Sequence, residues 1–192
     1  MRRKAAVFFD RDGVLNKAVI KDGKPFPPAD AESLVITPGA AERLNALKSR
    51  GFVLVCVTNQ PDVARGGRTL SNVEEMNHKV RTHLPLDDLL TCFHDGSDNC
   101  DCRKPKPGML LEAAGRWNLD LARSWMIGDR AGDIGAGRAA GCRTIFLDFD
   151  YAEPRPAPEA DFTCRSLDEA AAVIMERICE DSKNEICERS VD

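Results

Sequence analysis

The sequence contains no run of apolar residues long enough to cross a lipid bilayer, which takes about 20 residues in a helix. It also has no excess of basic residues, because 27 Lys and Arg stand against 31 Asp and Glu for a net charge of −4. Proteins that bind nucleic acids or anionic membranes usually carry such an excess on one surface. The composition therefore indicates neither a nucleic acid nor a membrane as a partner.

The first residues do not have the pattern of a secretory leader. The basic start Met-Arg-Arg-Lys is followed by an apolar stretch, residues 5–9, that is too short for the hydrophobic core of a signal peptide. We therefore expect a cytoplasmic protein. With 192 residues and no internal repeat, we expect one domain over residues 1–180, followed by a charged, flexible tail over residues 181–192. The oligomeric state stays open, and a monomer is compatible with the sequence.

The eight cysteines do not form the pattern of a disulfide framework. Cys92, Cys100 and Cys102 lie close together, beside His94. In a chain without a leader, clustered Cys and His favour a metal site over disulfides. Four such ligands fill the tetrahedral coordination of Zn²⁺, so we predict a closed, structural zinc site that holds residues 92–102.

Two acids follow the first apolar run. Residues 5–9 predict a buried strand, and Asp10 and Asp12 come directly after it, with Gly13 beyond. The functional crevice of an open parallel sheet lies at the carboxyl ends of its strands. Side chains alternate along a strand, so both acids can face one pocket while Arg11 points away. Paired carboxylates suit phosphoryl transfer, in which one attacks phosphorus and the other moves protons. An isolated Asp-x-Asp also fits a solvated turn.

Further polar residues stand at the ends of later strands or beside the Cys/His cluster. A hydroxyl and backbone N–H groups after the predicted strand 52–57 can hold phosphate oxygens, and a guanidinium and an ammonium can bind phosphate as well. We predict that these positions bind substrate: Thr58, Asn59, Gln60, Arg103 and Lys104. The alternatives are a hydrogen-bonded turn and a solvated basic run. A third strand-end acid, Asp129, follows residues 125–128, with Asp133 close behind.

The alternation of apolar runs with helical patterns predicts an α/β fold with a doubly wound, mostly parallel Rossmann-like sheet, helices on both faces and a small zinc-pinned loop. Additional strands are expected at 89–93 and 144–147. Capping residues place helix starts at Thr37, Ser71 and Ser166, the last of these helices reaching about Glu180. Residues 17–36 are expected to form a loop, either a plain connection or a rim that faces substrate.

The ordered set of motifs resembles the haloacid dehalogenase superfamily. These motifs are Asp10-Arg11-Asp12-Gly13-Val14-Leu15-Asn16, then Thr58, then Lys104-Pro105, then Gly128-Asp129 with Asp133. The resemblance implies that Asp10 is the nucleophile and Asp12 the general acid and base. It implies magnesium bound by the Asp10 carboxylate, the Asp12 backbone carbonyl and Asp129, with Asp133 supporting them. Thr58 and Lys104 would stabilise the transferring phosphoryl group, and Arg103 would recognise the substrate. No insertion is long enough for a separate cap domain.

Within that superfamily, the triplet 58–60, the Cys/His cluster and residues 102–105 resemble the zinc-containing heptose bisphosphate phosphatases. This implies a Mg-dependent phosphatase that works through an aspartyl-phosphate and converts D-glycero-D-manno-heptose 1,7-bisphosphate to heptose 1-phosphate. Histidinol-phosphate phosphatases share the zinc loop and are the alternative. Ala64-Arg65-Gly66 favours the heptose branch, whereas Pro61-Asp62 stands where heptose enzymes typically have small residues. A nucleic-acid end phosphatase and a non-catalytic zinc-stabilised binding module are further alternatives.

Overall fold

The computed structural model describes residues 3–189, and for residues 181–189 it describes the helical backbone alone. Its centre is one six-stranded sheet, made of β1 (Ala6–Phe9), β4 (Val53–Asn59), β5 (Asp88–Cys92), β6 (Trp125–Gly128), β7 (Arg143–Leu147) and β8 (Phe162–Cys164). The strand order is β5-β4-β1-β6-β7-β8, and every neighbouring pair is parallel. The edge strand β8 was not predicted, because three residues are too few to show a periodic pattern.

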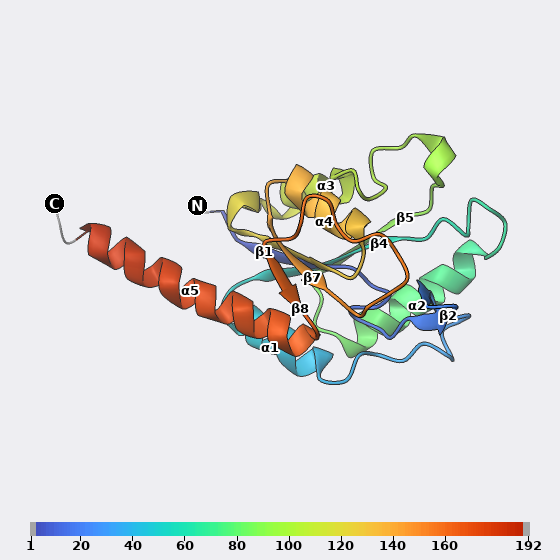
Figure 1. Ribbon diagram of the computed structural model, residues 1–192, viewed down its shortest axis with the longest axis horizontal. Helices are drawn as coiled ribbons and strands as arrows, with labels where there is room; N and C mark the ends of the chain where they lie inside the picture. The colour runs from blue at the N-terminus through green and yellow to red at the C-terminus, as the bar shows by residue number, and fades with distance from the viewer. Residues whose placement is uncertain (1–2, 190–192) are drawn as a thin grey trace.

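Helices cover both faces of the sheet (Figure 1). The apolar sides of α1 (Ala40–Ser49), α2 (Leu70–His83) and α5 (Leu167–Arg189) pack on one face, and those of α3 (Gly108–Trp117) and α4 (Ala131–Ala139) pack on the other. Strand β1 supplies both cores by alternation, since Val7 and Phe9 enter the first and Ala6 and Phe8 the second. Two short 3₁₀ helices, η1 (Gly96–Asp98) and η2 (Leu121–Arg123), lie on either side of α3 in the chain. The predicted doubly wound fold is confirmed, and residues 3–189 contain no separate cap domain.

The loop predicted over residues 17–36 is wrong in part. Strands β2 (Val19–Lys21) and β3 (Lys24–Phe26) form an antiparallel hairpin there. Asp22 and Gly23 make its turn with φ angles of 51° and 72°. Asp-Gly is a strong hairpin signal because both positions need a left-handed backbone. The three prolines nearby favoured a loop and hid that signal.

Two predicted helix caps are also wrong. Helix α1 starts after Gly39, whose φ is 76°, and the Thr37 hydroxyl instead donates to the Val14 carbonyl at 2.8 Å. Helix α2 is capped by Thr69, whose hydroxyl accepts the Asn72 N–H at 3.2 Å, whereas Ser71 lies inside the helix. Several Ser or Thr residues near one helix start fit the capping pattern equally well, so the sequence alone does not choose among them.

Helix α5 continues to Arg189, so its predicted end near Glu180 is wrong. Residues 181–189 contain neither glycine nor proline, which are the usual stop signals. The predicted flexible tail includes residues 190–192, which lie outside the described part of the chain. Among the helices of the described residues, none combines the length and the apolar character that a membrane span requires.

Candidate active site

The site forms where the order of the strands reverses. The chain runs outward from β1 to β4 and β5 and then returns to place β6 on the other side of β1. Strand-end crevices at such a reversal are the usual ligand sites of open α/β sheets. Asp10 and Asp12 follow β1 and Asp129 follows β6, while the Asp10 N–H donates to the Ile127 carbonyl at 3.0 Å. This neighbourhood brings the predicted acids together.

Asp10, Asp129 and Asp133 form an acid cluster, in which one carboxylate oxygen from each residue lies within 4.8 Å of the others and all three residues are buried. Asp133 is already bonded, since it pairs with Lys104 at 2.6 Å and accepts the Arg130 N–H at 3.0 Å. Both oxygens of Asp129 are buried without a hydrogen-bond partner. Burial, followed by the charges of Asp10 and Asp133, raises the pKa of Asp129 well above its ordinary value. Unpartnered buried oxygens in an acid cluster fit a hard divalent cation such as Mg²⁺.

Gly13 permits the close packing of the two strand ends. A Cβ atom at Gly13 would lie 1.9 Å from Asp129 Oδ2, and the residue has a φ of +96°. Any side chain here would be strained and would displace the acid. The glycine of the Asp-x-Asp-Gly motif is therefore needed for the position of Asp129.

Lys104 connects the acids to the sheet. Its ammonium donates to Asp10 Oδ1 at 2.6 Å and to the Val57 carbonyl at 2.7 Å, in addition to the pair with Asp133. Burial by itself would lower the pKa of Lys104, but Asp10 and Asp133 overcome this and raise it. Burial raises the pKa of Asp10 to about 6, with Lys104 acting in the opposite direction and Asp133 and Asp12 adding to the rise.

The triplet after β4 lies beside these acids. The Gln60 amide nitrogen donates to Asp12 Oδ2 at 2.8 Å and to the Thr58 hydroxyl at 2.9 Å. Asn59 bonds the backbone of Lys104 in both directions, since its Nδ2 donates to the carbonyl at 3.0 Å and its Oδ1 accepts the N–H at 3.2 Å. Asn59 and Gln60 thus hold other site residues, a task for which the triplet gave no sequence signal. Their predicted contact with substrate stays a prediction.

A cavity of about 410 Å³ opens over this centre. Its volume suits a small molecule. It is lined by the predicted residues Asp10, Asp12, Asn59, Gln60, Arg103, Lys104 and Asp133. Five other charged residues line it as well, namely Lys24, Asp62, Arg65, Arg130 and Glu153. Lys24 belongs to the segment 17–36, for which a rim that faces substrate was one of the two expectations. Sequence reasoning assigned no role to Arg130, which directly follows Asp129, or to Glu153, which has no local signal.

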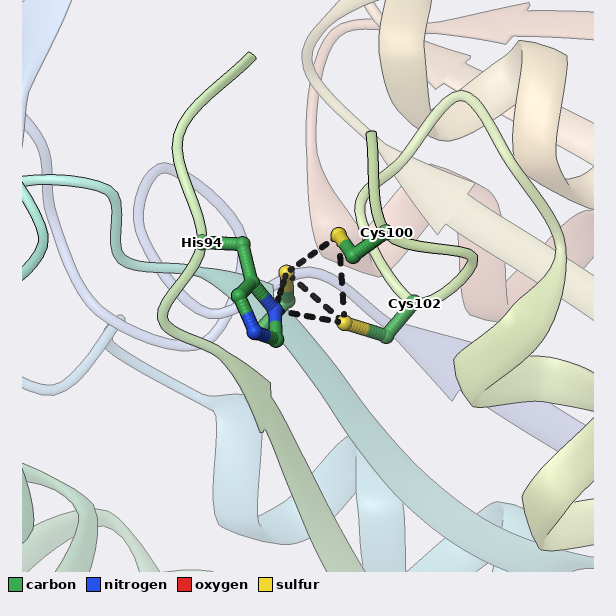
Figure 2. A group of neighbouring side chains, drawn as sticks. His94, Cys100 and Cys102 are labelled. Carbon is green, nitrogen blue, oxygen red and sulfur yellow. Dashed lines mark hydrogen bonds between the residues drawn. The ribbon is translucent and has the colours of Figure 1, made fainter. Parts of the chain in front are cut away.

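The predicted zinc ligands form a second cluster, drawn in Figure 2. The sulfurs of Cys92, Cys100 and Cys102 are 3.0 to 3.7 Å apart, and His94 Nδ1 lies 3.3 Å from Cys102 Sγ and 3.7 Å from Cys92 Sγ. Ligands about 2.3 Å from a tetrahedral metal ion are separated by about 3.7 Å, so this spacing fits one ion. The four residues therefore fit a single tetrahedral metal centre.

The Cys/His cluster also carries a side chain of the pocket. Arg103 directly follows Cys102, lines the cavity and donates to the His94 carbonyl at 3.2 Å. Arg65 lines the cavity as well and pairs with Asp95 at 2.5 Å. Two pocket guanidinium groups are thus held by the segment that contains the candidate metal ligands.

The site combines buried acids with a buried lysine at the point where the strand order of the parallel sheet reverses. This combination is typical of one class of hydrolases. The model of the haloacid dehalogenase-like hydrolases matches residues 27–141, and the chain belongs to this family. Within it, the chain belongs with the D-glycero-beta-D-manno-heptose-1,7-bisphosphate 7-phosphatases. It is 33% identical to the Helicobacter pylori protein of that name over 91% of this chain and 99% of the relative. It is 32% identical to the Escherichia coli K12 protein over 84% of this chain and 89% of that relative.

A solved structure agrees with this placement. The D,D-heptose 1,7-bisphosphate phosphatase from B. bronchiseptica, complexed with magnesium and phosphate, has a TM-score of 0.73 and 26% identity, covering 92% of this chain and 99% of that one. The predictions of the superfamily, of the heptose bisphosphate phosphatase branch and of a phosphatase of the haloacid dehalogenase class are therefore confirmed.

Proposed function

We propose that the protein hydrolyses D-glycero-β-D-manno-heptose 1,7-bisphosphate at its 7-phosphate and leaves heptose 1-phosphate. The names of its relatives support this substrate. The observation that carries the proposal is that Asp10 and Lys104 line a pocket with cationic side chains and that the buried Asp129 lies beside Asp10.

The residues of this centre divide the reaction into two steps. A carboxylate oxygen of Asp10 attacks phosphorus, the bond to the sugar oxygen breaks, and Asp12 gives that oxygen a proton. Asp12 then takes a proton from water, whose oxygen attacks the aspartyl-phosphate, releasing phosphate and restoring Asp10. Lys104 and Thr58 hold the oxygens of the moving phosphoryl group. This chemistry needs mainly positioning and compensation of charge.

We propose that Asp10, the Asp12 carbonyl and Asp129 hold Mg²⁺, with Asp133 keeping Lys104 in place. The cation supplies positive charge for the acids and the phosphoryl oxygens. Asp129 is the best-suited ligand because its oxygens are buried without a hydrogen bond of ordinary geometry and have the neutral Tyr151 hydroxyl nearby, whereas those of Asp133 are bonded to Lys104 and to Arg130 N–H.

The charges of the exposed part of the pocket favour a bisphosphate over histidinol phosphate. Four cationic side chains line it besides Lys104, namely Lys24, Arg65, Arg103 and Arg130, against the two outer acids Asp62 and Glu153. Arg65 and Arg130 already pair with Asp95 and Glu153, so Lys24 and Arg103 are the cations that would attract a second phosphate. The ammonium of histidinol phosphate is repelled.

We propose that the Cys/His cluster holds a structural Zn²⁺, because four protein ligands fill its coordination sphere. We also propose a cytoplasmic location, since such a site needs cysteines that remain reduced.

A hydrolysis screen tests the proposal. The purified protein with Mg²⁺ is given heptose 1,7-bisphosphate, heptose 7-phosphate and histidinol phosphate, and released phosphate is measured. We expect the largest kcat/KM for the bisphosphate, with heptose 1-phosphate as product, and no turnover by the matched variant Asp10→Asn. A larger kcat/KM for histidinol phosphate would contradict the proposed substrate.

A further inference from the structure

Arg11 stands between the two acids in sequence but does not line the pocket. Its residue is 0% exposed. A guanidinium that is removed from water destabilises the fold unless its charge and its N–H groups are paired. The hydrogen-bond partners of Arg11 therefore indicate what this buried guanidinium does.

One partner is the carboxylate of Asp12. Arg11 Nη2 donates to Asp12 Oδ2 at 2.9 Å and to Oδ1 at 3.2 Å, and Nε donates to Oδ1 at 3.3 Å. Asn16 Nδ2 donates to Oδ1 at 3.1 Å, and Gln60 Nε2 donates to Oδ2 at 2.8 Å. Charge-assisted bonds from a rigid fork fix the orientation of a carboxylate more strongly than neutral ones. Asp12 is thus held from three sides.

The other partner is Asn77 on α2. Its Oδ1 accepts Arg11 Nη1 at 2.8 Å, and its Nδ2 donates to the Thr91 hydroxyl on β5 at 3.1 Å. Asn77 is 3% exposed and lies among the buried apolar residues Val73, Met76 and Val80 of the same helix. A buried amide in an apolar stripe destabilises a helix interface unless it is bonded. Here its bonds lead through Arg11 to Asp12.

We propose that Asn77 is a positioning residue for the reaction, which holds the Arg11 guanidinium and through it the Asp12 carboxylate. Neither Asn77 nor Arg11 lines the pocket. The inference rests on the proposed function, in which Asp12 moves the proton of the leaving group and of water. When Asn77 no longer holds the Arg11 guanidinium, Arg11 no longer fixes the orientation of the Asp12 carboxylate. Protonation of the leaving oxygen by Asp12 then slows.

This role predicts a dependence on the leaving group. A sugar or other alkyl phosphate releases an alkoxide that needs a proton, whereas p-nitrophenyl phosphate releases a phenolate that is stable without one. In Asn77→Leu, which keeps the size and removes both polar atoms, we expect kcat/KM for the sugar phosphate to fall by about 10- to 100-fold. We expect kcat/KM for p-nitrophenyl phosphate to fall by less than about 3-fold, because kcat/KM reports the steps up to release of the phenolate and not the later attack of water.

Two further variants separate positioning from packing. Asn77→Asp keeps an acceptor for Arg11, and we expect it to recover part of the sugar-phosphate activity that the leucine variant loses. Val80→Ala removes buried apolar volume from the same side of α2 without touching Arg11, and we expect it to lower the melting temperature while the ratio of the two activities stays unchanged. Thr91→Val removes the outermost bond and should shift the ratio in the same direction as Asn77→Leu, by a smaller factor.

The outcomes are distinct. A selective loss on the alkyl ester, with partial recovery in Asn77→Asp, supports the proposal. Equal losses of kcat/KM on both esters in Asn77→Leu, or no loss in any variant of this chain of contacts, overturn it. A wild-type protein that hydrolyses neither ester overturns the proposed function itself, which is a result that the variants do not mimic.

Discussion

The acid cluster and the Cys/His cluster both bring candidate metal ligands within 4.8 Å of one another, but they are built differently. The acid cluster takes Asp10 from the end of β1, Asp129 from the end of β6 and Asp133 from α4, and all three are buried. The Cys/His cluster lies within residues 92–102, and of its four members Cys92 alone is buried. One cluster is held by the whole sheet and the other by a single segment.

This difference has an energetic consequence. Three buried carboxylates repel one another, and the stability of the sheet keeps them together until a cation and a substrate arrive. The segment of the Cys/His cluster has little core of its own, since η1 contains no buried residue. We therefore expect its order to depend on the proposed metal ion, because binding free energy at such sites is also folding free energy. Damage to the first cluster should stop chemistry, and damage to the second should lower stability.

The largest expected effect is that of Asp10→Asn. We expect kcat to fall by at least about 10⁴-fold, since the nucleophile is lost. We expect an unchanged or slightly higher melting temperature, because one of the crowded carboxylates becomes neutral. Zinc content should not change. A variant with substantial turnover, or one that unfolds, would break the assignment of chemistry to this cluster.

Removal of magnesium should have nearly the same effect on activity and be reversible. After dialysis against buffer without divalent cations we expect turnover to stop while the circular dichroism spectrum and the zinc content remain unchanged. Added Mg²⁺ should restore the rate. The variant Asp129→Asn should need more Mg²⁺ for half-maximal activity, and full turnover without any Mg²⁺ would contradict the role given to Asp129.

Cys100→Ser tests the second cluster, and its effect should be on stability. We expect loss of zinc and a lower melting temperature, by about 2 to 4 °C for each kcal/mol lost in a chain of this size. The magnesium-dependent activity per folded molecule should change much less than in Asp10→Asn. Cys179→Ser, at an exposed cysteine outside the cluster, is the matched control. Retained zinc with unchanged melting would refute the structural assignment.

The smallest effect is a pH dependence of stability in the magnesium-free protein. Burial raises the pKa of Asp10 to about 6 from its ordinary value of 3.8, so the folded state binds more protons than the unfolded state between these values. The contribution of Asp10 to stability is therefore present at low pH and is lost as the pH rises from about 4 to about 6. The urea midpoint of the wild type minus that of Asp10→Asn should fall over this interval. A difference in urea midpoint that does not change with pH would contradict the raised pKa of Asp10.

Features whose residues are close in sequence were predicted well, and features that depend on the fold were predicted less well. The Cys/His cluster and Asp10-x-Asp12 were recognised because their members are close in sequence. The β2–β3 hairpin was missed, although Asp22-Gly23 signalled it, because nearby prolines favoured a loop. Glu153 was not predicted at the pocket, because its place there depends on the fold. Asn77 was not singled out either, since a single polar residue in an apolar helical stripe has no local signature.

The sequence by itself determined five of the eight described strands, most of the helices and the types of ligand, because these depend on local periodicity and on side-chain chemistry. Only the tertiary structure decided which distant groups meet. The parallel pairing of β1 with β6 brings Asp129 against Gly13, and the return of the chain after the Cys/His segment brings Lys104 to Asp10. Such meetings result from sheet order and packing, which no short stretch of sequence encodes.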